Sequence, residues 1–151
     1  MEVFLFVAAL VLLGFFVPLS KRKAAKPRGV PYSREAISLM KGHDFERYCA
    51  GLLRYNGYLN VTVTQGSGDR GVDIICEKDK KRYAVQCKRQ AGKVGRRAVQ
   101  EIYTGKAIYK CDVGVILTNA DFSESAVKDA QELGIELWCG IRLKQLHNFD
   151  E

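Results

Sequence analysis

The stretch that decides the fold is residues 72–89, VDIICEKDKKRYAVQCKR. Its two segments VDIICE and RYAVQCKR are rich in β-branched and aromatic residues, and the polar run KDKK separates them. This pattern predicts two antiparallel strands joined by a hairpin. Because side chains alternate along a strand, Gln86 and Lys88 lie on one face, about 7 Å apart, opposite Val85 and Cys87.

An acid stands in the first of these strands, where Asp73 has apolar neighbours. Since hairpin-linked strands pair, Asp73 can lie beside Gln86 and Lys88. Burying an unpaired carboxylate is costly, and a divalent cation would offset that cost. Asp73, the side-chain oxygen of Gln86 and the backbone carbonyl of Cys87 are oxygen ligands of the kind that Mg²⁺ prefers. Lys88 would then stabilise phosphorane charge or help to deprotonate water. In the alternative, Asp73 and Lys88 form an ordinary cross-strand ion pair, and Gln86 hydrogen-bonds locally.

The segments on either side of the hairpin supply further elements. Before it we expect a helix start that Gly42 interrupts, a helix from an Asp44 N-cap to Asn56-Gly57, the strand LNVTVT and a Gly-rich turn, QGSGDRG. After it we expect helices and strands in alternation, namely helix 95–110, strand 112–119, helix 124–134 capped by Ser123, strand 135–139 and helix 141–149. Hairpins followed by a crossover predict the α/β class, with a mixed sheet covered by helices on both faces.

The N-terminus is a separate unit. Residues 3–19, VFLFVAALVLLGFFVPL, carry no charge and would form a helix roughly 25 Å long, enough to span a slightly thinned bilayer. We therefore expect a transmembrane anchor at 1–20, a basic linker at 21–33 and a globular domain at 34–151. The basic residues after the anchor predict a single-pass membrane protein with its N-terminus outside and its domain in the cytoplasm. A cleaved signal peptide is the alternative, but it would want positive charge before the apolar stretch.

The charge of the chain points to a polyanionic partner. The net charge is +7, and all 24 Lys and Arg residues follow the apolar stretch. This excess suits nucleic acid or an anionic membrane surface. The cysteines show no CxxC or Cys/His cluster that would bind zinc, so we interpret them as reduced thiols. They are Cys49, Cys76, Cys87, Cys111 and Cys139.

Several blocks together resemble a known family. GHDFERYCAGLLRYNGY, VTVTQGSGDRGVDII, YAVQCKR and VGRRAVQEI stand in the order and spacing of the Mrr-type restriction endonuclease-like family, within the PD-(D/E)xK nuclease superfamily. The resemblance runs from about Gly42 to Leu146. It implies a restriction-endonuclease-like αβββαβ core, which agrees with the order of elements expected above.

The resemblance also implies roles for individual residues. Asp73 would be the metal-binding acid and Lys88 the catalytic lysine. Gln86 stands where the superfamily more often has Asp or Glu, so metal affinity should be weaker. Glu46 resembles an additional family acid that reaches the metal site. The implied cofactor is Mg²⁺ or Mn²⁺, with no small-molecule cofactor, the implied partner is DNA, and a homodimer is one possible assembly.

Secondary candidates lie around these residues, and each has a structural alternative. Asp69 and Arg70 belong either to a solvated turn or to a loop whose amides approach a phosphate. Gln100 and Glu101 open a helix, where Glu101 either interacts favourably with the N-terminal end of the helix dipole or takes part in the site. Basic residues after the third strand could contact DNA phosphates or form a solvated face. They are Arg89, Lys93, Arg96 and Arg97.

The function expected from these features is a membrane-anchored, magnesium-dependent DNA endonuclease that hydrolyses phosphodiester bonds. The first alternative is a catalytically inactive, membrane-tethered DNA-binding module. A second alternative is a scaffold whose basic patch holds lipid headgroups, but that function leaves the buried acid Asp73 unexplained.

Overall fold

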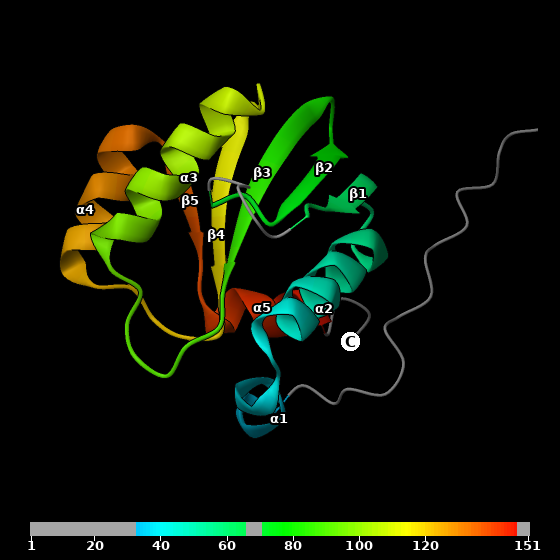
Figure 1. Ribbon diagram of the computed structural model, residues 1–151, viewed down its shortest axis with the longest axis vertical. Coiled ribbons are helices and arrows are strands. Elements are labelled where there is room, and N and C mark those ends of the chain that lie inside the picture. The colour runs from blue at the N-terminus through cyan, green and yellow to red at the C-terminus, as the bar shows by residue number, and fades with distance from the viewer. Residues whose placement is uncertain (1–32, 66–70, 148–151) are drawn as a thin grey trace, which may run out of the picture.

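The computed structural model describes residues 33–65 and 71–147, which form one five-stranded sheet between two layers of helices (Figure 1). The strands are β1 (Leu59–Val63), β2 (Ile74–Lys78), β3 (Lys81–Lys88), β4 (Val113–Thr118) and β5 (Ile135–Trp138). The helices are α1 (Arg34–Leu39), α2 (Gly42–Tyr55), α3 (Arg96–Ile108), α4 (Glu124–Leu133) and α5 (Gly140–His147).

The strands lie in the sheet in the order of the chain, β1-β2-β3-β4-β5. The pairs β1–β2 and β2–β3 are antiparallel, whereas β3–β4 and β4–β5 are parallel. The expected mixed sheet is therefore confirmed. The hairpin between β2 and β3 is confirmed as well, with Ile74 opposite Val85.

Helices cover both faces of this sheet, as expected. The helices α2 and α5 pack over one face, around Phe45, Val85 and Leu143. The helices α3 and α4 pack over the other face, around Ile102 and Ile116. Alternate residues of β3 enter the two cores, so this central strand divides its side chains between the two layers.

The start of α2 differs from the expectation. Gly42 does not interrupt a helix but begins one, because the break comes at Met40 and Lys41, whose backbones are extended. The predicted N-cap at Asp44 is wrong, since Asp44 lies in the first helical turn and pairs with Arg47. A carboxylate in that position still favours the helix dipole.

Other helix ends follow the sequence signals. The Ser123 hydroxyl accepts a hydrogen bond from the Ala126 amide at 3.2 Å, as expected of an N-cap. Gly134 ends α4 with a left-handed backbone, φ +63°. Asn56 is the C-cap of α2, and Gly57 after it has φ +81°.

The expected membrane anchor, residues 3–19, lies outside the described residues, as does nearly all of the linker. Asp69 and Arg70 also lie outside them. Among residues 33–65 and 71–147, no helix is long and apolar enough to cross a membrane.

Candidate active site

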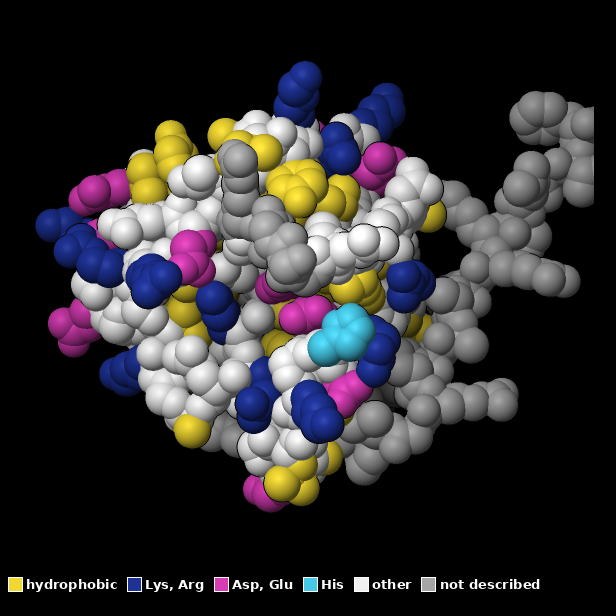
Figure 2. Space-filling model, in the orientation of Figure 1, with side chains coloured by type: hydrophobic (Ala, Val, Ile, Leu, Met, Phe, Trp, Pro, Cys, Tyr) yellow, Lys and Arg dark blue, Asp and Glu magenta, His cyan; other side chains and the backbone are white. Residues whose placement is uncertain are grey.

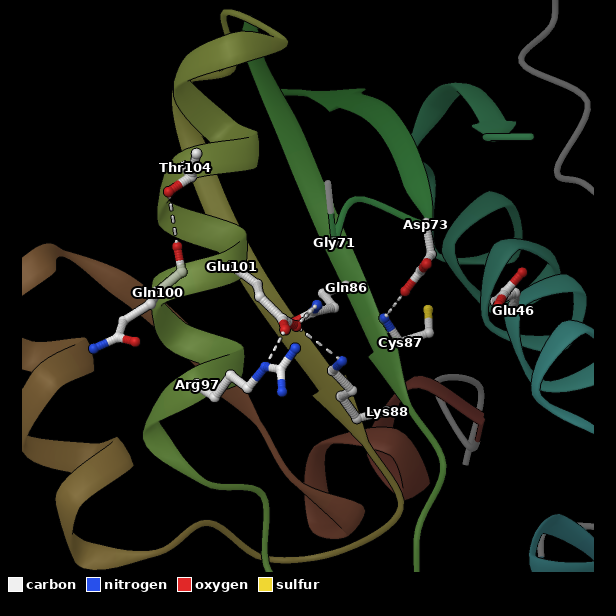
Figure 3. A pocket seen from close by; sticks show the side chains of 10 residues that line it. All are labelled: Glu46, Gly71, Asp73, Gln86, Cys87, Lys88, Arg97, Gln100, Glu101 and Thr104. Carbon is white, nitrogen blue, oxygen red and sulfur yellow. Dashed lines mark hydrogen bonds and ion pairs between the residues drawn. The ribbon is translucent and has the colours of Figure 1, made fainter. Parts of the chain in front are cut away.

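The end of β3 carries the residues around which the site is built. Val85 is buried in the core under α2, whereas Gln86 and Lys88 turn toward α3 (Figure 3). This is the division between faces that the alternation of the strand predicts. Gln86 is 1% exposed, which makes it one of the few buried polar residues described.

Asp73 joins this strand end through the backbone. It precedes β2 by one residue, yet its amide donates to the Val85 carbonyl at 2.9 Å, and its carbonyl accepts from the Thr64 amide at 2.9 Å. The chain at Asp73 is thus hydrogen-bonded on both sides like a strand. Its carboxylate oxygen Oδ2 accepts the amide of Cys87 at 2.6 Å, which directs it onto the end of β3.

One pocket of about 790 Å³ brings these groups together with side chains from two helices (Figure 3). Glu46 comes from α2 on the side of Asp73, and Glu101 comes from α3 on the side of Gln86 and Lys88. The complete lining is Glu46, Gly71, Asp73, Gln86, Cys87, Lys88, Arg97, Gln100, Glu101 and Thr104.

The Glu101 carboxylate holds three donors in place. Its oxygen Oε2 accepts from Gln86 Nε2 at 3.0 Å and from Lys88 Nζ at 3.1 Å. Its oxygen Oε1 accepts from Arg97 Nε at 2.9 Å. Burial alone would raise the pKa of Glu101, but the hydrogen bonds from Gln86 and Lys88, the Lys88 charge and the Arg97 contact lower it overall.

The bond to Glu101 also determines which way the Gln86 amide faces. A carboxylate only accepts hydrogen bonds, so it must meet the NH₂ group of the amide and not its oxygen. The other atom, Oε1, is buried, and no donor in the described part of the chain reaches it. A buried polar atom is costly to leave without a partner, and a water molecule or a cation could supply one.

Gly71 packs directly against this amide. A Cβ atom built on Gly71 would lie 2.7 Å from Gln86 Nε2 and 2.9 Å from the Cβ of Glu101. Gly71 also has φ +79°, a conformation that favours glycine. The last glycine of the turn QGSGDRG therefore lets the backbone approach Gln86 and Glu101 closely.

The donors in the pocket fit a hard divalent cation. Asp73 offers a carboxylate, Gln86 an unpartnered amide oxygen, and the Cys87 carbonyl points to the same strand edge as its amide, toward Asp73. Among the described residues, no three His, Cys, Asp or Glu side chains cluster to hold a metal ion.

The sulfur of Cys87 takes no part in this donor set. Its pKa is raised well above the ordinary value, first by a hydrogen bond with Cys49 and then by burial. The thiol is therefore neutral and faces the apolar core under α2. All five cysteines are free.

The expected DNA contacts separate in the structure. Arg97 and Gln100 line the pocket, although Figure 3 shows the Gln100 amide extending away from Glu101. Arg96 instead forms a double hydrogen bond with Asp129 on α4, at 3.0 and 2.8 Å. Arg89 donates to the Ser38 carbonyl of α1 at 2.8 Å, and Lys93 lies exposed in the loop before α3.

On the face of the molecule shown in Figure 2, charge is not concentrated in one place. Figure 2 shows Lys and Arg side chains spread around this face of the molecule, with acidic side chains between them. On this face the basic excess of the sequence therefore does not by itself outline a binding surface. The pocket residues are better defined by their contacts than by the charge around them.

The comparisons with known proteins identify the family and the fold. The family model Mrr_cat, described as "Restriction endonuclease", matches residues 37–147. The chain belongs to the Mrr-type restriction endonuclease family. The family span contains Glu46, Asp73, Gln86, Lys88 and Glu101, and hence all the acids of the pocket.

Two solved structures are similar in fold to this restriction endonuclease domain. The protein of unknown function AF1548 is 24% identical with a TM-score of 0.57, over 66% of this chain and 58% of its own. The DNA modification-dependent restriction endonuclease AspBHI is 16% identical with a TM-score of 0.58, over 81% of this chain and 37% of its own. The chain thus spans less than two thirds of either protein. No curated protein sequence matches it.

Sequence reasoning left Glu101 between a dipole role and a site role, and the structure places its carboxylate in the pocket, in contact with Gln86 and Lys88. Glu101 is the sixth residue of α3, beyond the first turn, so the interpretation as a dipole partner is wrong. A signal was present, because Glu101 is the only acid in α3 (RRAVQEIYTGKAI) and stands four residues after Arg97. What could not be predicted is its contact with Gln86.

Proposed function

We propose that this chain is a membrane-anchored, metal-dependent endonuclease that hydrolyses phosphodiester bonds in DNA. The observation that carries the proposal is the buried, unpartnered Oε1 of Gln86, in a pocket that also holds the carboxylate of Asp73 and the ammonium of Lys88. Membership of the restriction endonuclease family supports DNA as the substrate.

The cation in this proposal is Mg²⁺ or Mn²⁺, held by Asp73, the Gln86 side-chain oxygen and the Cys87 carbonyl. Glu46, whose side chain is 23% exposed, adds an acid from α2. A divalent cation at such a site polarises a phosphate and makes water a better nucleophile. Gln86 is buried, whereas Asp73, Cys87 and Glu46 are partly exposed, so water can reach the site as the nucleophile.

The other residues act on the DNA itself. Lys88 approaches from the α3 side of the pocket, where its ammonium can donate to a phosphate oxygen and stabilise the negative charge that develops there. Arg97, whose side chain is 91% exposed, can contact a flanking phosphate at the mouth of the pocket. Arg96 is engaged with Asp129 and is not assigned a DNA contact.

The central experiment is plasmid cleavage by the full chain, purified in detergent, with Mg²⁺ or with EDTA. We expect cleavage only with the metal, and a loss on the order of 10²- to 10³-fold in Asp73→Ala and Lys88→Ala. Lys128→Ala, which removes an exposed lysine of α4, serves as the matched control and should cleave normally.

DNA binding is measured with the same proteins in a salt titration. Both site variants should keep salt-sensitive binding, because most phosphate contacts remain. Equal cleavage by the wild type and both variants would contradict the mechanism. If the wild type binds DNA without metal and does not cleave it, the result would instead favour the inactive DNA-binding module.

The membrane anchor in this proposal is the apolar stretch 3–19, with the basic run that begins at Lys21 on the cytoplasmic side. Deleting residues 1–20 should abolish flotation of the chain with lipid vesicles. Flotation of the shortened chain to the same extent would refute the anchor, and dependence of that flotation on anionic lipid would favour a basic membrane-binding patch.

A further inference from the structure

The amide of Gln86 can be placed in two ways that differ in their effect on a cation. Rotation by half a turn about its last side-chain bond exchanges Oε1 and Nε2. In one orientation the site gains an oxygen ligand, and in the other it presents an NH₂ group, which repels a cation. A carboxylate at this position would have no such wrong orientation, because both of its ends are oxygen.

Glu101 distinguishes between these two orientations. Its Oε2 lies 3.0 Å from Gln86 Nε2, and a carboxylate cannot meet an amide oxygen at that distance without repulsion. Glu101 is itself held from two further sides, by Lys88 at 3.1 Å on Oε2 and by Arg97 at 2.9 Å on Oε1. Figure 3 shows these contacts converging on its carboxylate.

We propose that Glu101 is a positioning residue that selects the orientation of Gln86 in which Oε1 is available to the cation. This inference rests on the proposed metal-dependent function. Glu101 acts by fixing the orientation of the Gln86 amide. A glutamine that stands in place of an acidic ligand needs such a partner. Gly71, which has no side chain, leaves the room for this contact.

The test is a titration with Mn²⁺ by calorimetry on the full chain in detergent, without DNA. Glu101→Asp keeps the charge but shortens the side chain, so it loses the reach to Gln86 Nε2. We expect its Mn²⁺ affinity to fall about tenfold, the effect of losing one hydrogen bond to a charged group. If Glu101 acted only through its field, this variant would bind as tightly as the wild type.

The same substitution made in a Gln86→Glu background separates an effect on the orientation of residue 86 from damage to the fold. In Gln86→Glu no orientation has to be selected, so adding Glu101→Asp there should not weaken Mn²⁺ binding. Glu101→Gln provides a second pair of variants. With Gln86 present, Glu101→Gln should weaken Mn²⁺ binding, because the new amide can pair with either orientation of the Gln86 amide. In the Gln86→Glu background it should not weaken Mn²⁺ binding, because the NH₂ group of the new amide at position 101 donates to the carboxylate at position 86.

The outcomes are distinguishable from failure of the proposed function. Absence of Mn²⁺ binding by the wild type would overturn the metal site and this inference together. Normal binding by the wild type with unchanged binding in Glu101→Asp, or equal weakening in both backgrounds, would overturn the inference alone. Glu132→Gln, an exposed acid on α4, is the control for loss of charge and should bind as the wild type does.

Discussion

The two faces of the sheet are filled differently. Under α2 and α5 the core is mostly apolar, with fully buried side chains such as Phe45, Leu53 and Val85. Its buried amide, Asn56, is hydrogen-bonded to backbone carbonyls of both helices. Under α3 and α4 the apolar core stops at the end of β3, where Gln86 and Lys88 meet Glu101. Both faces therefore have an apolar core, but only the face under α3 and α4 gives part of its area to the polar cluster of Gln86, Lys88 and Glu101.

The largest effect on stability is expected on the apolar face. Phe45 is 0% exposed, and Phe45→Ala should lower the free energy of unfolding by about 3–5 kcal/mol, through lost burial and a residual cavity. Urea denaturation of the full chain measures this change. A loss below about 1 kcal/mol would show that this face does not dominate the stability of the domain.

A smaller effect is expected where the backbone meets the polar cluster. Gly71→Ala forces a side chain onto a backbone with φ +79° and places its Cβ 2.9 Å from the Cβ of Glu101. We expect a cost of about 1–3 kcal/mol in the free energy of unfolding. Gly57→Ala is the control, because its φ is +81° but a Cβ there would meet nothing within 4 Å. Equal costs would mean that the backbone, and not the close approach to Glu101, decides the effect.

Removing the amide should hardly change stability while it weakens cation binding. Gln86→Leu leaves Glu101 with Lys88 and Arg97 and removes a buried oxygen that has no partner in the described part of the chain. Loss of the hydrogen bond between Gln86 and Glu101 destabilises the fold, whereas removal of the unpartnered oxygen stabilises it. Because these two effects oppose each other, we expect a change of less than about 1 kcal/mol in the free energy of unfolding. Mn²⁺ affinity should fall at least tenfold, roughly the value of one good ligand. A large loss of stability would show that the polar cluster also supports the fold.

The smallest effect is expected from pH. The pKa of Glu101 is lowered in the folded chain, so its ionised form stabilises the fold above the ordinary glutamate pKa of 4.5. That contribution is lost as the pH falls through the lower folded-state pKa. The difference in unfolding free energy between the wild type and Glu101→Gln should therefore shrink as the pH falls below the ordinary glutamate pKa of 4.5. A difference that stays constant over this range would contradict the role of the Lys88 and Arg97 contacts.

Much of this architecture could be predicted because it depends on local patterns. The hairpin of β2 and β3, the mixed sheet and the caps at Ser123 and Gly134 all follow from periodicity and from residues with special backbone preferences. The N-cap predicted at Asp44 was wrong because the extended backbone ends at Lys41, which precedes α2 without a side-chain cap hydrogen bond, and Asp44 lies inside the first turn. The meeting of Asp73, Gln86 and Lys88 in one pocket was predicted from strand pairing, and their catalytic roles stay a prediction.

What the sequence by itself determined is the division of β3, with Gln86 and Lys88 on one face and Val85 on the other. Alternation along a strand is a property of the backbone and needs no knowledge of the neighbouring helices. What only the tertiary structure decided is the partner of Gln86 and Lys88. Glu101 reaches them because the packing of Ala98 and Ile102 against the sheet sets the rotation of α3, and that rotation depends on contacts between segments far apart in the chain.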